Sequence, residues 1–187
     1  MKYRFTTSGF TLVETLIVIA LSVGMLIVLC MLIRSFNTSY SYEQGAAISA
    51  ESARSVMRET ESLTLVADHV LQSHTFSTTT YTSSSTVLVL EIPSIDSSGA
   101  IISSTYDYAV FYSNGTHAYR ILAANAASKR VSGTKQLSDT ISSLTFSYNN
   151  TNFTLVNTIT VDVQTLMQLR GQSSIDHRSE QLYLRNF

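Results

Sequence analysis

The chain has 187 residues, and 12 Lys and Arg against 13 Asp and Glu residues give it a formal net charge of −1. A nearly neutral chain lacks the basic surplus of a general nucleic-acid-binding protein, so no such partner is predicted. The length suits one folded domain plus an anchor. Cys30 is the single cysteine, which excludes an intramolecular disulfide, so we expect packing alone to stabilise the fold.

The first feature along the chain is an apolar segment, Phe10–Ile33, in which Glu14 is the only charged residue. Its 24 residues, at about 1.5 Å each in a helix, are long enough to cross a hydrocarbon core of about 30 Å. Lys2 and Arg4 precede the segment, which favours an N-terminus in the cytoplasm and export of the remainder. The pattern therefore predicts a single-pass protein of the cytoplasmic membrane.

Two other kinds of N-terminal signal fit this segment less well. A cleavable secretory signal has a shorter apolar core and small residues at its cleavage site, which Cys30–Arg34 does not offer. A lipoprotein signal needs a small residue where Leu29 stands, so Cys30 is interpreted as a small hydrophobic residue of the helix. An ordinary signal anchor has the same orientation and stays open as an alternative.

Glu14 is the chemically unusual residue of the segment. A carboxylate at the centre of a bilayer costs roughly 2.5–3.5 kcal/mol, so a charged partner is expected for it.

The segment Gly9-Phe10-Thr11-Leu12-Val13-Glu14, with a basic head before it and an apolar run after it, resembles the processing site of type IV pilins and type II secretion pseudopilins. The resemblance implies that a prepilin peptidase cleaves between Gly9 and Phe10 and methylates the new amino group. That amine would lie about one helical turn from Glu14, and it would neutralise the carboxylate of its own chain or of an adjacent subunit. It also implies that Glu14 is the glutamate that sets the register of subunits in a filament. The implied partners are other pilin or pseudopilin subunits, the prepilin peptidase, the inner-membrane assembly platform and the lipid bilayer.

Helical periodicity continues beyond the apolar run, from Ser35 to about Ala67, with Gly45 as its only strong helix weakener. Residues recurring at steps of three and four form one weakly apolar face: Ala46, Ala50, Ala53, Met57, Thr60, Leu63 and Ala67. The predicted organisation is a leader at 1–9, a membrane or filament-core helix at 10–34, an amphipathic helix at 35–70 and a β-rich head at 71–187.

Strand signals dominate after a Ser- and Thr-rich stretch at 72–86, which is interpreted as a loop with room for one short strand. The predicted strands are 87–92, ending at Pro93; 106–112 and 116–122, joined at Asn114-Gly115; 144–148 and 153–165; and 181–185. The segments 123–138 and 172–180 are predicted as loops. In the strand 153–165, odd-numbered residues from Leu155 to Val163 are expected to face the core.

These elements predict an α+β fold, with a long N-terminal helix followed by an antiparallel sheet of about six to eight strands. The ending Leu184-Arg185-Asn186 resembles that of J-class minor pseudopilins, and a minor rather than a major subunit is also favoured by the absence of a C-terminal disulfide loop. The predicted function is a minor pilin or pseudopilin of a pilus, competence or secretion filament. The alternative is a signal-anchored surface protein whose β domain binds a ligand or partner.

No motif predicts catalysis or a cofactor, so a non-enzymatic protein without cofactors is expected. His69 and His74 are five residues apart, off the spacing that places two ligands on one helical face, and no metal site is predicted there. Asp176-His177 is interpreted as a solvated pair in a loop. Asp107 is expected to face solvent from a strand.

Overall fold

The computed structural model describes residues 11–185 and confirms the α+β fold, with one long helix followed by antiparallel strands. The chain divides into two compact units, residues 1–41 and 42–187, called here the N-terminal and C-terminal units. The elements are α1 (Leu12–Thr64), β1 (His69–Val70), β2 (Ser73–Phe76), β3 (Thr79–Thr82), β4 (Val87–Ile95), β5 (Ile101–Asn114), β6 (His117–Ala123), β7 (Gly133–Ser138), β8 (Ile141–Tyr148), the 3-10 helix η1 (Phe153–Leu155), β9 (Thr158–Leu169) and β10 (Gln172–Tyr183).

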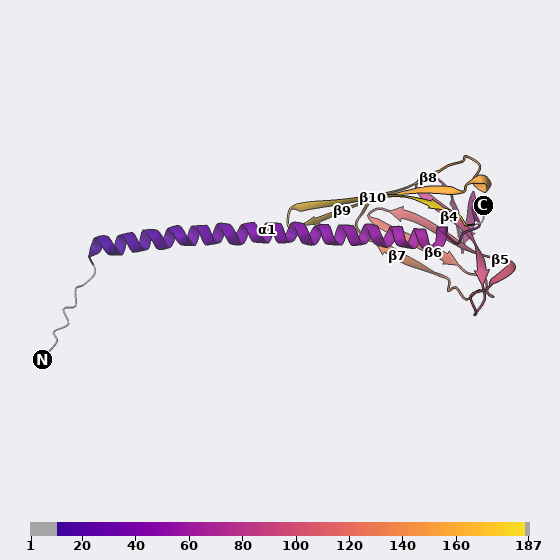
Figure 1. Cartoon of the computed structure of the whole chain (residues 1–187), viewed down its shortest axis with the longest axis horizontal. Coiled ribbons are helices and arrows are strands. Elements are labelled where there is room, and N and C mark those ends of the chain that lie inside the picture. The colour runs from indigo at the N-terminus through magenta and orange to yellow at the C-terminus, as the bar shows by residue number, and fades with distance from the viewer. Residues whose placement is uncertain (1–10, 186–187) are drawn as a thin grey trace. The chain divides into compact units, whose positions relative to one another are not determined.

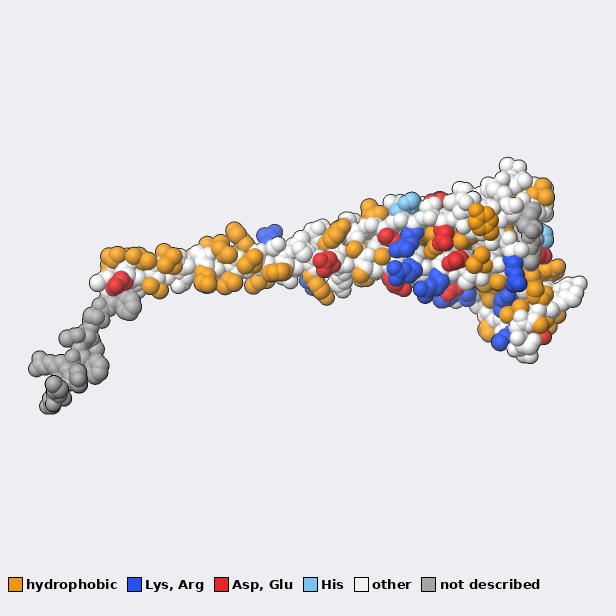
Figure 2. All heavy atoms as spheres, in the orientation of Figure 1, with side chains coloured by type: hydrophobic (Ala, Val, Ile, Leu, Met, Phe, Trp, Pro, Cys, Tyr) orange, Lys and Arg blue, Asp and Glu red, His pale blue; other side chains and the backbone are white. Residues whose placement is uncertain are grey.

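In the N-terminal unit, the described chain is the first part of α1, and its large apolar side chains are exposed from Leu12 to Ile33. Figure 2 shows hydrophobic side chains along this part of the helix and a concentration of charged side chains in the C-terminal unit. Among residues 11–185, α1 is the helix long and apolar enough to cross a membrane, by length and composition.

In the C-terminal unit, α1 buries one stripe of side chains and leaves its other positions exposed or half-buried. The later members of the predicted stripe are buried, whereas Ala46 and Ala50 are half-buried, and Gly45 and Ser49 take the most buried positions of that region. The buried positions of the helix from Tyr42 onward are Gly45, Ser49, Ala53, Val56, Met57, Thr60, Leu63 and Thr64. The stripe is therefore rotated slightly from the predicted one at its beginning.

Gly45 and Ser49 allow the helix to approach the sheet of β8, β9 and β10 closely. A Cβ atom on Gly45 would lie 3.6 Å from the Cβ of Ser174 and 4.0 Å from the Cγ of Met167. One turn later, the Ser49 and Thr165 hydroxyls are hydrogen-bonded at 2.7 Å, both fully buried. The glycine that weakens the helix in isolation thus lies directly against this sheet.

Two antiparallel sheets and the helix enclose the main core. The larger sheet has the strand order β1-β4-β5-β6-β7, and the other has the order β10-β9-β8. Figure 1 shows β9 and β10 along one side of the α1 segment and β6 and β7 along the other. Phe111 from the larger sheet, Phe146 from the smaller sheet and Val56 from the helix are all fully buried in this core.

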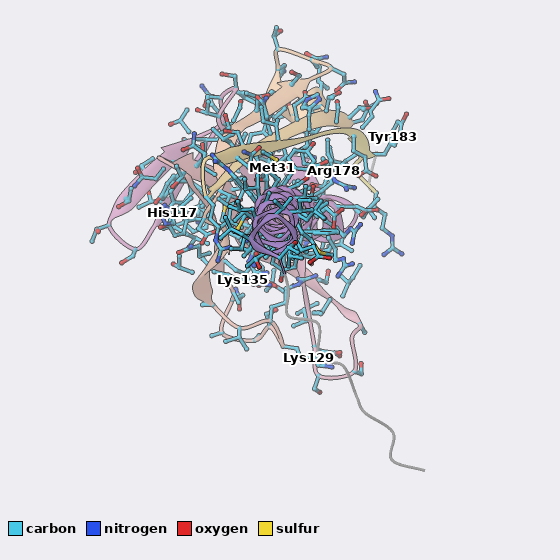
Figure 3. All side chains as sticks on the ribbon, turned by 90° about the vertical axis from the view of Figure 1, so that its left-hand side faces the viewer. Met31, His117, Lys129, Lys135, Arg178 and Tyr183 are labelled. Atoms are coloured by element: carbon cyan, nitrogen blue, oxygen red, sulfur yellow. The ribbon has the colours of Figure 1, made fainter. Side chains whose placement is uncertain are left out.

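Two ion pairs add a polar connection between the helix and the larger sheet. Glu59 of α1 accepts a hydrogen bond from Arg120 of β6 at 2.9 Å and another from Lys135 of β7. In Figure 3, Lys135 lies beside the helix, whereas His117 lies well away from it. The sequence places Glu59 off the apolar face of the helix. In the structure, its ion pairs join the helix to β6 and to the edge strand β7 of the larger sheet.

The opposite face of the larger sheet carries a second, smaller core beneath the hairpin of β2 and β3. Phe76, Val89 and Val110 are its buried members. Aromatic rings continue this layer, with His74 stacked on Tyr108 at 3.7 Å between ring centroids. The alternation of β4 explains both cores, because Leu88, Leu90 and Ile92 face the helix while Val89 and Glu91 face the hairpin.

The described residues contain ten strands rather than six to eight, so the predicted strand count was wrong. The predicted loop at 123–138 contains β7, the predicted loop at 172–180 belongs to β10, and the 72–86 stretch forms the two strands β2 and β3. Pro93 does not end its strand, since β4 continues to Ile95 through an irregularity in register.

The strand predicted at 153–165 begins only at Thr158, after the 3-10 turn η1. The expected inward residues Ile159, Val161 and Val163 are buried, but Leu155 is exposed because it lies in that turn. Val156, which the alternation assigned to solvent, is fully buried. The 3-10 turn therefore breaks the alternation before the strand starts.

Candidate functional site

The first turn of α1 is closed by a reciprocal pair of hydrogen bonds between Thr11 and Glu14. The Thr11 backbone N–H donates to Oε2 of Glu14 at 2.9 Å, and the Glu14 N–H donates to Oγ1 of Thr11 at 3.3 Å. The Thr11 hydroxyl also donates to Oε2 at 2.9 Å. This is a capping box, in which each residue satisfies a backbone N–H that the helix itself leaves without a partner.

The capping box directs the Glu14 carboxylate toward the beginning of the helix. Both hydrogen bonds to the carboxylate use Oε2, and Oε1 makes none with residues 11–185. A negative charge is favoured at this end of a helix because the backbone N–H dipoles point toward it. Within residues 11–185, Oε1 is therefore without a donor, and it faces the helix start, where it can accept a hydrogen bond from a cation.

Gly9 and Phe10, the two residues assigned to processing, lie outside the described residues, so Glu14 is the member of the predicted site that the structure describes. The capping box was readable in the sequence as Thr-x-x-Glu before an apolar run, and our sequence reasoning missed it. From the sequence, Glu14 was interpreted only as a charge and not as the hydrogen-bond acceptor of a helix cap.

Asp107 was predicted to face solvent, and this prediction was wrong because its side chain is fully buried. One carboxylate oxygen accepts hydrogen bonds from the Ser94 hydroxyl and the Asn125 N–H, both at 2.8 Å. The other accepts from the Ser128 hydroxyl and from Nη1 of Arg130, both at 2.7 Å. Burial opposes ionisation, but these donors together hold the pKa of Asp107 below its ordinary value.

The arrangement around Asp107 is structural. Arg130 also donates to the carbonyl of Pro93 at 2.6 Å, so every polar group of the cluster is tied to a strand or to the loop between β6 and β7. The cluster fixes that loop against the end of β4 and the middle of β5.

The histidines are separated in the structure. His74 stacks on Tyr108, whereas His69 lies beside Asp68 and Glu91, and one ligand atom from each of these three lies within 4.8 Å of the other two. Asp176 and His177 belong to β10 rather than a loop. Because neighbouring strand residues point to opposite faces, Asp176 bonds Arg178 at 2.9 Å while His177 pairs with Asp162 at 3.6 Å, and the two do not form a dyad.

Comparisons with known proteins found no match for this chain among family models, curated proteins or solved structures. The α+β class and the membrane-spanning capacity of α1 are therefore the established descriptors of the protein.

Proposed function

We propose that this chain is a minor subunit of a type IV pilin-like filament, processed by a prepilin peptidase between Gly9 and Phe10. In this proposal it is a structural, non-enzymatic protein that is stored in the cytoplasmic membrane with its β-rich unit exported. Its partners are other subunits of the filament and the platform that extracts it from the membrane.

The observation that carries the proposal is the position of Glu14. It lies in the first turn of a helix whose other residues from Leu12 to Ile33 are uncharged, and its carboxylate is directed toward the helix start. Cleavage after Gly9 would create an amine one residue before Thr11, whose N–H already bonds the carboxylate. A cation at that place would neutralise a charge that is otherwise costly in a membrane or a filament core.

The exposed apolar surface of α1 supports the same proposal. Side chains on every face from Leu12 to Ile33 are exposed, as expected of a segment that lies in lipid or among identical apolar helices. When such helices stack, a carboxylate that meets no amine stays unpaired in a low dielectric, and that penalty favours one axial stagger. Glu14 and the Phe10 amine together would thus select the register of assembly.

Because Thr11 and Glu14 form a capping box, substitutions can remove the charge of Glu14 and the capping hydrogen bonds separately. Glu14→Gln keeps an acceptor that suits this position of a capping box but removes the charge. Thr11→Ala removes the cap, at about 0.5–2 kcal/mol of helix stability, and keeps the charge. Glu14→Ala removes both.

All three variants are expected to be cleaved in the native host, since each keeps Gly9 and Phe10. We expect Glu14→Gln and Glu14→Ala to be depleted from isolated filaments by at least tenfold, and Thr11→Ala to be incorporated nearly as well as wild type. The readout is an immunoblot of the filament and membrane fractions. Normal incorporation of Glu14→Gln would show that the charge is dispensable and would overturn the proposed role.

A further inference from the structure

We propose that Asp68, His69 and Glu91 form a binding site for Zn²⁺ on the hairpin-facing side of the larger sheet. One ligand atom from each residue lies within 4.8 Å of those of the other two. The site lies wholly in the C-terminal unit, so it is independent of filament assembly through Glu14.

The backbone brings the three residues together. His69 of β1 lies directly opposite Glu91 of β4 in the antiparallel ladder, which places the two side chains on the same face, about 4.5–5.5 Å apart at Cβ. Asp68 precedes β1 in a bend, and its N–H donates to the Glu91 carbonyl at 2.8 Å. The bend releases Asp68 from strand alternation, so its carboxylate reaches the His69 ring at 3.3 Å.

Charge compensation in this cluster is incomplete. Asp68 and Glu91 are both half-buried, and within residues 11–185 neither pairs with a Lys or Arg side chain. A divalent cation would supply the missing positive charge.

The donor set favours zinc over calcium or magnesium. Ca²⁺ and Mg²⁺ prefer oxygen ligands alone, whereas Zn²⁺ accepts an imidazole together with carboxylates. With bonds of about 2.0–2.1 Å, the edge of a tetrahedral zinc site is about 3.4 Å, and the 3.3 Å between His69 Nδ1 and Asp68 Oδ2 already matches it. In this proposal, rotation of the Glu91 side chain brings its carboxylate to the third coordination position of the zinc. Because His69 is partly exposed, a water molecule can take the fourth position.

Tyr108 supports the Glu91 side of this site. It is the partner of Glu91 across β4 and β5, and it lies beneath the stacked ring of His74. A ring directly opposite Glu91 on the same face of the sheet limits the directions that the Glu91 side chain can take.

The test is a titration of the full chain in detergent, first stripped with a chelator, with zinc chloride in a calorimeter. We expect one Zn²⁺ per chain with a Kd in the micromolar range, corresponding to about 8 kcal/mol. His69→Ala and Glu91→Gln should each weaken binding by at least tenfold. His117→Ala, which removes a histidine of β6 that is not among the three residues, is the matched control and should bind as wild type.

Far-UV circular dichroism of each variant without zinc checks that the fold persists, and Asp68→Asn replaces any variant that fails this check. Absence of saturable binding at about 100 µM zinc would overturn the site and leave a structural ion pair only. Unchanged affinity in His69→Ala would place the zinc elsewhere and overturn it as well. Equal competition by millimolar Ca²⁺ would contradict the role of the imidazole.

Discussion

Replacing Asp107 with alanine tests how the loop between β6 and β7 is held. The substitution removes an acceptor that is fully buried and that four donors share. It leaves the Asn125 N–H and two hydroxyls without their partner and the Arg130 guanidinium without its counter-charge.

Removing one member of a buried ion pair costs about 3–5 kcal/mol. Arg130 keeps its hydrogen bond to Pro93 and is 16% exposed, so water can solvate it in part. We therefore expect Asp107→Ala to lower the free energy of unfolding by about 3 kcal/mol, at the lower end of that range. The control is Asp139→Ala, an exposed acid for which a change within about 0.5 kcal/mol is expected.

The assay is urea unfolding of the full chain in detergent, followed by near-UV circular dichroism of the tyrosines. A double-mutant cycle with Arg130→Ala isolates the pair, and the double variant should cost less than the sum of the single variants by at least about 1 kcal/mol. A loss below about 1 kcal/mol in Asp107→Ala, or strict additivity in the cycle, would refute the bracing role.

The Asp107 carboxylate also makes the free energy of unfolding depend on pH. The pKa of Asp107 is lowered in the fold, so its stabilising contribution is complete above about pH 4, the pKa of an unfolded aspartate. The contribution is lost as the pH falls through the lower folded value. Wild type should therefore lose stability more steeply below pH 4 than Asp107→Ala does, and parallel curves would contradict the assignment.

Two further substitutions test the contacts of α1 in the C-terminal unit. Gly45→Ala should stabilise the protein by up to about 1 kcal/mol, because glycine weakens a helix and the added methyl would meet Ser174 at 3.6 Å, an ordinary contact distance. Gly45→Leu should instead destabilise the protein by about 1–3 kcal/mol, because the larger side chain overpacks the contact. Both are measured by thermal melting, and stabilisation by leucine would contradict the close approach. Glu59→Gln should lower the free energy of unfolding by about 1 kcal/mol at low salt and by less at high salt, because its two basic partners are partly exposed. A loss of stability that does not depend on salt would argue against the ion pairs.

The sequence predicted the elements whose local signals agree with their packing. The apolar run defined the first part of α1, and Asn114-Gly115 defined the hairpin of β5 and β6, where Gly115 has a φ of 61°. Val89 and its neighbours predicted β4 although both faces of that strand are buried. In each case, composition and turn chemistry pointed to the same structure.

Polar strands could not be recognised in the same way. β10 is rich in Ser, Gln and charged residues, and it is a strand because it pairs along its whole length with β9. Its turn is Arg170-Gly171, with φ values of 49° and 79°, and an arginine in a left-handed conformation is not a turn signal in a sequence. Pairing with β9, rather than the composition of residues 172–183, therefore makes this segment a strand.

The candidate sites depended on long-range contacts to different degrees. Thr11 and Glu14 are three residues apart, so their capping box could be read from the sequence. The Asp107 cluster and the approach of His69 to Glu91 join residues far apart in the chain. Only the register of β1 on β4, which no local signal encodes, brings those two side chains together.

The mature N-terminus tests the central claim most directly. Intact-mass measurement and N-terminal sequencing of the protein from its native host should find a chain that begins at N-methylated Phe10. Its mass should be about 1 kDa lower, because nine of 187 residues in a 20.6 kDa chain are removed. A mature chain that retains Met1–Gly9 would contradict the proposed amine partner of Glu14 and would favour a signal-anchored surface protein.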